Sequence, residues 1–276
     1  MKNETIKGIT GHQSFHLRKD WIPKAIRAIK KNEVNIFSGK NLIHCIDEFG
    51  LGSNMIKSLQ YWLKILGVVT KIGKDYKLQQ KYLDMFDNDM LLSSEHSIQM
   101  IHIDFCDNFP LWEYVIRKDK VKFFTRKELI ERADIVFKEH GQPYDNKTLS
   151  SLVSVLINTF VSSEDNPEDR STSPLAELNL LENTVDGYRF RMLGISDVLP
   201  ETILYILLNK QPHEQITLNN AVNLITGYFH LEYYECMKII GILEQKGKLA
   251  FDRAVGLNNI ILYELPEQKE EQLTLF

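Results

Sequence analysis

The chain has 276 residues and a formal net charge of −4, with 43% hydrophobic and 25% charged residues. This composition is that of a folded globular protein of about two domains, and it excludes a disordered or fibrous chain. We expect a cytoplasmic protein without a secretory signal or membrane helix, because no apolar run approaches ~18–20 residues and the three scattered cysteines form no disulfide or zinc framework.

Charge is distributed unevenly along the chain. Residues 1–80 carry 14 Lys and Arg against 6 Asp and Glu, a net charge of +8, whereas residues 81–276 have a net charge of −12. Because neutralisation of phosphates supplies most non-specific affinity for DNA, the basic head indicates contact with double-stranded DNA. The alternative is a chance drift in a chain of mixed charge.

Residues 11–21, GHQSFHLRKDW, form a non-periodic segment before the first expected helix. Such residue types in a shaped loop favour a functional role, so His12, Gln13 and Arg18 are candidate DNA contacts. The alternative is that these side chains satisfy buried carbonyl groups. His12 and His16 also have the spacing of two metal ligands on a helix, but no glutamate of a zinc-protease motif accompanies them.

Three helices and a hairpin are expected next, and their order is that of a winged helix-turn-helix. Ser38 is the expected cap of the second helix and Ser53 of the third, while Gly67 is expected to end the third helix. The expected ranges are 21–31, 39–49, 53–67 and, for the hairpin, 68–78.

The third helix has polar residues and no acidic residue on its expected outer face. Such side chains donate hydrogen bonds to phosphates and base edges, although winged helices also serve as protein-docking modules. Ser53 and Ser58 share the face. The candidate DNA contacts are Asn54, Lys57, Gln60, Tyr61 and Lys64, with Lys74 on the hairpin, where Lys71 and Lys77 add positive charge.

The middle of the chain is expected to be helical, with helices at 98–105, 127–140, 148–160 and 200–208 and a strand at 121–124. Thr125 and Glu128 have the spacing of a capping box. Carboxylates can hold Mg²⁺ or Mn²⁺ for hydrolysis of a phosphodiester, which makes Asp104, Glu164, Asp165 and Glu177 candidate catalytic residues. The alternative for the acidic run at 162–173 is a solvated loop.

A second helix-turn-helix-like unit is expected between Thr217 and residue 263. Thr217 caps a helix at 218–226, Gly227 makes a turn, and a further helix ends at Gly247 before a hairpin formed by 249–251 and 260–263. Residues 214–263 have 4 basic and 5 acidic side chains, so we interpret this unit as a packing or dimerising module.

The chain finishes with Gln-Leu-Thr-Leu-Phe after an acidic tether. This peptide resembles the bacterial sliding-clamp-binding peptide, in which Gln272 would fill a polar pocket and Leu273, Leu275 and Phe276 would enter apolar ones. The alternative is a terminal strand that packs on its own body. A clamp contact would raise the local concentration on DNA.

The expected fold is therefore mainly α with short β-hairpins. The expected segments are a basic winged-helix DNA-binding domain at 1–80, a helical middle domain at 81–210, a winged-helix-like packing or dimerisation unit at 211–265 and a flexible tail at 266–276.

The segments GHQSFHLRKDW, FGLGSNMIKSLQYW and SPLAELNLL resemble the domain-of-unknown-function family DUF4007, over roughly residues 8–263. That family includes the SspB component of the bacterial Ssp DNA phosphorothioation and defence system. The resemblance implies a DNA-nicking protein that works with a cysteine desulfurase, an ATPase and a PAPS-reductase-like ATP pyrophosphatase. The chain shows no PD-(D/E)xK, HNH or GIY-YIG motif.

Three functions follow as hypotheses: a DNA-nicking subunit of a phosphorothioation system, a non-enzymatic subunit that recognises DNA, and a transcription regulator with a dimerising C-terminal unit.

Overall fold

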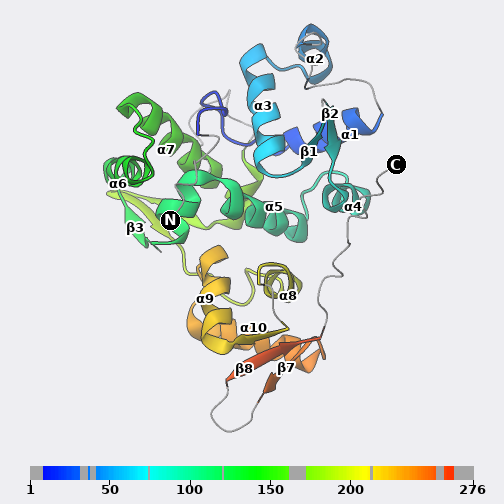
Figure 1. Ribbon diagram of the computed structural model, residues 1–276, viewed down its shortest axis with the longest axis vertical. Coiled ribbons are helices and arrows are strands. Elements are labelled where there is room, and N and C mark those ends of the chain that lie inside the picture. Colours follow the sequence, from blue (N-terminus) through cyan, green and yellow to red (C-terminus); the bar gives the residue numbers. More distant parts are fainter. Residues whose placement is uncertain are drawn as a thin grey trace. The chain divides into compact units, whose positions relative to one another are not determined.

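The computed structural model describes residues 9–31, 37, 42–73, 75–119, 121–161, 172–211, 214–252 and 258–263. The protein is mainly helical with small antiparallel sheets, which confirms the expected fold class at that level. It divides into two compact units, Met1–Arg191 and Met192–Phe276 (Figure 1). The finer division at residues 80, 210 and 265 stays a prediction.

The first unit combines helices with two small sheets, β1-β2 and β3-β5-β4. Its elements are α1 (Trp21–Lys30), α2 (Leu42–Phe49), α3 (Ser53–Ile65), β1 (Val69–Ile72), β2 (Asp75–Leu78), α4 (Gln80–Asn88), α5 (Glu95–Asn108), the π-helix η2 (Trp112–Arg117), β3 (Phe123–Phe124), α6 (Arg126–Glu139), α7 (Asn146–Phe160), the 3-10 helix η4 (Pro174–Leu178), β4 (Leu181–Thr184) and β5 (Gly187–Phe190).

The core of this unit surrounds α5, in which every residue from Ser97 to Cys106 is buried. Phe105 contacts Trp62 of α3 and Phe160 of α7 at ring-centroid distances of 6.1 and 5.2 Å. Trp112 of η2 stacks on Phe160 at 4.5 Å. Each such ring buries a large apolar area, so this aromatic cluster joins α3, α5, α7 and η2 into one core.

Local capping signals account for several helix boundaries. Thr125 and Glu128 form the expected capping box at the start of α6. Gly67 follows Leu66, the C-cap of α3, and has φ of 67°, a conformation that glycine adopts without steric cost. The expected cap at Ser53 is wrong, because Ser53 is the first residue of α3 and Gly52 is the N-cap. Ser38 lies outside the described residues.

The described part of the second unit consists of three helices and the sheet β6-β8-β7. Its elements are α8 (Pro200–Asn209), β6 (Gln215–Thr217), α9 (Leu218–Tyr228), α10 (Tyr233–Gln245), β7 (Leu249–Asp252) and β8 (Asn259–Leu262).

Thr217 caps α9 as expected, its side chain accepting from the Asn220 N–H. The expected turn at Gly227 is wrong, because α9 continues through this residue to Tyr228. Tyr228, the last residue of α9, is 1% exposed, and packing of its ring in the core stabilises the last turn of the helix.

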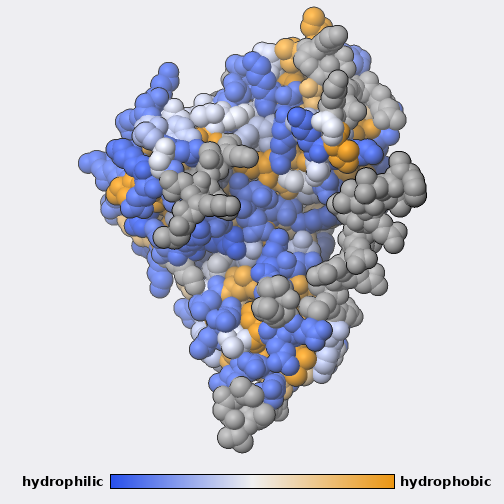
Figure 2. All heavy atoms as spheres, viewed as in Figure 1, coloured by the Kyte–Doolittle hydropathy of each residue, from blue (hydrophilic) through white to orange (hydrophobic). Residues whose placement is uncertain are grey.

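Hydrophilic residues cover most of the described surface in Figure 2, and apolar residues appear between them in small groups. Among the described residues, no helix is both long and apolar enough to span a bilayer.

We expect Phe160→Ala to lower the free energy of unfolding of the first unit by about 3–5 kcal/mol, because it removes a ring packed between Phe105 and Trp112. Chemical denaturation measures the loss. Phe123→Ala is the control, since Phe123 is 41% exposed, and should cost far less. Equal losses in the two variants would contradict a core built on this cluster.

Candidate nucleic-acid interface

Four lysines of α3 and the β1–β2 hairpin form what we call the lysine surface: Lys57, Lys64, Lys71 and Lys77. All four are exposed, and α3 contains no acidic residue. Among the described residues, no carboxylate lies within ion-pair distance of any of the four. Their charge is therefore available to an anionic ligand.

The lysines of α1 differ, because carboxylates neutralise them. Lys24 pairs with Asp20 and Lys30 pairs with Asp87, each with an N–O distance of 2.5 Å. Within the described residues, the lysines of α3 and the hairpin therefore differ from those of α1 in having no carboxylate partner.

Aromatic rings fix the position of Lys64 on this surface. Its ammonium lies 4.8 Å from the ring centroid of Tyr76 in β2 and 5.1 Å from that of Phe37. The two rings stack on each other at 4.1 Å. These contacts connect α3 to the hairpin and hold the ammonium near the ring faces without a carboxylate.

The candidate DNA contacts on α3 divide into two groups. Asn54 and Lys57 are exposed and Gln60 is half-buried, so they face outward as predicted. Tyr61 and Ser58 do not, because they are 9% and 0% exposed. The outward position expected for these two residues is wrong. Lys74 lies outside the described residues.

The segment 9–20, which we call the lead-in loop, is the reason for this burial. The Phe15 carbonyl accepts hydrogen bonds from Ser58 Oγ at 3.4 Å and Trp62 Nε1 at 3.2 Å. A Cβ added at Gly11 would lie 2.4 Å from the Tyr61 ring, so the backbone approaches Tyr61 at a distance that only glycine permits. The loop therefore covers one side of α3.

His12 lies inside this loop and is 3% exposed. Its Nδ1 accepts from the Ser14 N–H at 3.0 Å, and its ring contacts Tyr61 edge-on. Burial lowers the pKa of His12 below its ordinary value, and the backbone of Ile9 opposes the effect. His12 and His16 do not lie on a helix, because residues 11–14 form a turn, so the helical spacing expected for two metal ligands does not occur in this described segment.

Gln13 and Arg18 occupy different environments in the loop. Gln13 is exposed with φ of 50°, so its side chain is available to a ligand. Arg18 is half-buried, and its guanidinium carbon lies 5.8 Å from the Phe15 ring and 5.7 Å from the Trp21 ring. These ring contacts give Arg18 a structural role in the loop.

The candidate catalytic carboxylates do not converge among the described residues. Asp104 on α5 accepts from Lys81 Nζ at 2.8 Å and from the Tyr82 hydroxyl at 2.7 Å. Glu177 forms an ion pair with Lys19. Glu164 and Asp165 lie outside the described residues, as does the C-terminal peptide from Gln272 to Phe276.

Of the candidate metal ligands, the described residues include Asp104 and Glu177, and these two belong to no cluster that could hold a metal ion. No group of three or more His, Cys, Asp or Glu side chains capable of holding a metal ion occurs in the described part of the chain. Asp104 already bonds to a cation and a hydroxyl, which occupies the oxygens that a metal would need.

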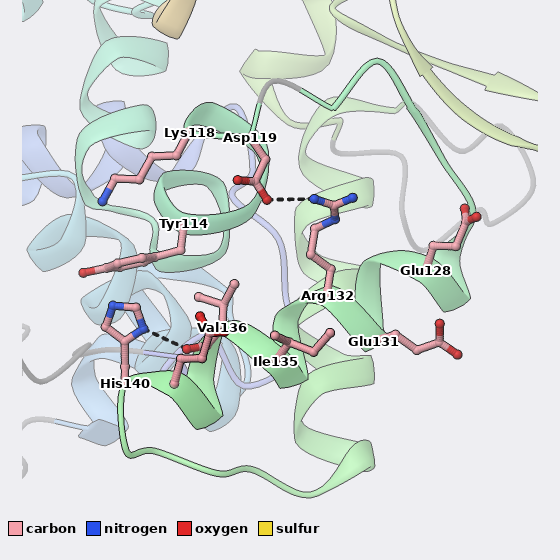
Figure 3. Close-up of a pocket in the computed structure, with 10 residues that line it drawn as sticks. Tyr114, Lys118, Asp119, Glu128, Glu131, Arg132, Ile135, Val136 and His140 are labelled. Carbon is pink, nitrogen blue, oxygen red and sulfur yellow. Dashed lines mark hydrogen bonds and ion pairs between the residues drawn. The ribbon is translucent and has the colours of Figure 1, made fainter.

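A cavity of about 620 Å³ between η2 and α6 has the opposite electrostatic character to the lysine surface (Figure 3). Arg132 points at Asp119 with an N–O distance of 2.7 Å, and the Lys118 ammonium lies 4.4 Å from the Tyr114 ring centroid and pairs with Glu113. Its remaining carboxylates belong to Glu128, Glu131 and Glu139. This excess of negative charge disfavours a phosphate ligand.

A second cavity, of about 420 Å³, lies where the lead-in loop meets the start of α7. Lys147, Thr148 and Ser151 line it from α7, and sequence reasoning missed all three residues. Their only local signal in the sequence is their position at the start of a helix. The loop that completes the cavity is more than 130 positions away in the chain, so no local pattern connects the two segments.

A family model described as "Protein of unknown function (DUF4007)" matches residues 9–275. No curated protein matches the chain. The fold is similar to a structure described as "Magnesium ion-bound SspB crystal structure", with a TM-score of 0.79 and 16% identity, and to an "SspB crystal structure", with a TM-score of 0.77 and 15% identity. Each match covers 92% of this chain and 82% of the other. At these identities the likeness establishes the fold alone.

We expect the protein to lose stability as the pH falls through the window just below 6.5, because the unfolded chain protonates His12 at a higher pH than the folded one. Melting temperatures at about pH 7.5 and about pH 5.5 measure this. The decrease should be smaller in His12→Asn, whereas exposed His96→Asn should behave like the wild type. An unchanged decrease in His12→Asn would show that His12 does not contribute.

Proposed function

The chain belongs to the DUF4007 family, and from this membership and its lysine surface we propose that it is a DNA-binding component of a bacterial DNA phosphorothioation defence system. The fold similarity to SspB structures supports the system. The lysine surface carries the proposal for DNA, because exposed lysines without carboxylate partners are what a protein needs to neutralise phosphates.

In this proposal α1, α2, α3 and the β1–β2 hairpin act as a winged helix. The element order supports it, with three helices followed by an antiparallel pair in which Val69 opposes Leu78. α3 is then the helix presented to the duplex, and the hairpin is the wing. Lys57 and Lys64 contact phosphates. Asn54 and Gln60 lie on the same helix and contact phosphates or base edges of the same duplex.

Nicking of one DNA strand is the finer part of the proposal, and it rests on the family resemblance. One structural neighbour is described as magnesium ion-bound, which is a statement about that protein. The candidate groups in this chain are Glu164 and Asp165, with Glu177. Asp104 differs from them, because its bonds to Lys81 and Tyr82 connect α5 to α4.

The proposed partners are the other proteins of such a system: a cysteine desulfurase, an ATPase and a PAPS-reductase-like ATP pyrophosphatase. The C-terminal peptide ending in Phe276 adds a proposed contact with the replication sliding clamp. A non-enzymatic recognition subunit or a transcription regulator would bind the duplex through the same lysine surface but leave supercoiled plasmid intact.

We expect the double variant Lys57→Glu and Lys64→Glu to weaken duplex binding at least tenfold and to flatten the salt dependence of the affinity, because two phosphate contacts are lost. Fluorescence anisotropy with a labelled duplex over a range of salt concentrations measures both effects. The matched control is Lys122→Glu with Lys127→Glu, two exposed lysines elsewhere in the first unit. Equal affinity of the two double variants would overturn the lysine surface as the DNA contact.

We expect purified protein to relax supercoiled plasmid when Mg²⁺ or Mn²⁺ is supplied, and Glu164→Gln with Asp165→Asn to abolish the activity while duplex binding is retained. Gel electrophoresis of the plasmid measures nicking. Asp104→Asn should instead lower the free energy of unfolding by about 1–3 kcal/mol, because it leaves Lys81 without its charged partner. Duplex binding without nicking in either metal would favour the non-enzymatic recognition subunit.

A further inference from the structure

We propose that the cavity between the lead-in loop and the first turns of α7 binds a phosphodiester group of the DNA backbone, next to the lysine surface. This inference rests on the proposed DNA-binding function and adds a second contact to it. We call the site the hydroxyl cavity; it has a volume of about 420 Å³.

The groups that line the hydroxyl cavity are those that bind phosphate oxygens. The lining residues include Thr10, Ser14, Thr148 and Ser151, which carry hydroxyls, Gln13, which carries an amide, and Lys147, which carries an ammonium. Most hydrogen bonds in protein–DNA interfaces go to phosphate and sugar oxygens of the DNA, and hydroxyl, amide and ammonium groups are among their donors. No described carboxylate lines this cavity, in contrast to the cavity in Figure 3.

Lys147 supplies the positive charge. It is exposed, and no carboxylate of the described residues lies within ion-pair distance of it. Asp145 is the neighbouring acid, and its side chain caps α7 by accepting from the Thr148 N–H at 2.8 Å. The bond to this N–H holds the pKa of Asp145 below its ordinary range, so Asp145 is charged at neutral pH and opposes an anion.

His12 provides an independent indication of a ligand. It lines the cavity, is 3% exposed, and its Nε2 has no hydrogen-bond partner among the described groups. Because Nδ1 accepts from the Ser14 N–H, the neutral ring carries its proton on Nε2. Buried donors without partners are uncommon in native proteins, so this N–H is one that a ligand oxygen would satisfy beside the Ile9 backbone, whose interaction raises the pKa of His12.

The shape of the loop is held by contacts on both sides of the cavity. Gln13 and Ser14 have φ of 50° and 66°, a region that costs energy for residues other than glycine. The His12–Ser14 bond and the 2.9 Å contact between the Ser14 and Ser151 hydroxyls maintain this conformation. The exposed Gln13 side chain and the Ser14 hydroxyl are thereby presented at the cavity before a ligand arrives.

The loop also places the hydroxyl cavity beside α3. Figure 1 shows the dark blue loop between α3 and α7. The same short segment bonds to α3 through the Phe15 carbonyl and to α7 through Ser14. A duplex that rests on α3 therefore has a second set of phosphate-binding groups within the same structural unit. Tyr61, which supports the loop at Gly11, acts as a positioning residue rather than a DNA contact.

The test is duplex affinity over a range of salt concentrations for full-length protein and single variants, measured by anisotropy with a labelled duplex. Lys147→Gln should weaken binding and reduce the slope of log affinity against log salt by about one, the change expected for one lost phosphate contact. Asp145→Asn keeps a capping oxygen and removes the opposing charge, so it should tighten binding. Lys122→Gln, at an exposed lysine outside the cavity, should leave the slope unchanged.

Melting temperatures of the variants establish that each is folded. A wild-type protein that does not bind the duplex would overturn the proposed function and this inference together. Normal wild-type binding with an unchanged slope in Lys147→Gln would overturn this inference alone. So would a reduced slope in Lys122→Gln equal to that in Lys147→Gln, or binding of inorganic phosphate that depends on Lys147 while duplex affinity does not.

Discussion

Burial of α5 on all sides is the constraint on which the first unit depends. Phe105 of this helix contacts Trp62, Phe109, Trp112 and Phe160, so the rings of four elements share one core. Since Trp62 and Leu59 must face that core, the orientation of α3 is fixed, and residues on its opposite side are turned to solvent. The exposure of Asn54 and Lys57 is thus a consequence of aromatic packing in the interior.

Electrostatics then distinguishes the surfaces that packing leaves exposed. Lysines on α3 and the hairpin have no carboxylate partner within the described chain, whereas those on α1 do. The cavity between η2 and α6 has its cations neutralised and extra carboxylates in its wall. Unneutralised positive charge, rather than total positive charge, determines which surface attracts a polyanion. The acidic balance of the whole chain is therefore compatible with a local DNA contact.

The lead-in loop connects these properties. It covers the side of α3 that carries Ser58 and Tyr61, and it completes the wall of the hydroxyl cavity with Ser14. Its conformation includes two residues at positive φ, which the surrounding bonds maintain. The lead-in loop, which in the sequence is a non-periodic segment before the first helix, thus links α3 to α7 in the structure.

The sequence by itself determined the helical fold class, most helix positions and the capping groups at Thr125 and Thr217, because these depend on periodicity and on bonds that span about three residues. It did not predict α4, although Tyr82, Met85 and Phe86 have helical spacing, nor did it predict η2 or the β4–β5 hairpin. Only the tertiary structure decided that Tyr61 lies beneath Gly11, that Asp104 bonds to Lys81, and that Ser14 meets Ser151. These contacts join residues 23 to 137 positions apart, and such pairings depend on how the elements fold onto α5 rather than on any local pattern.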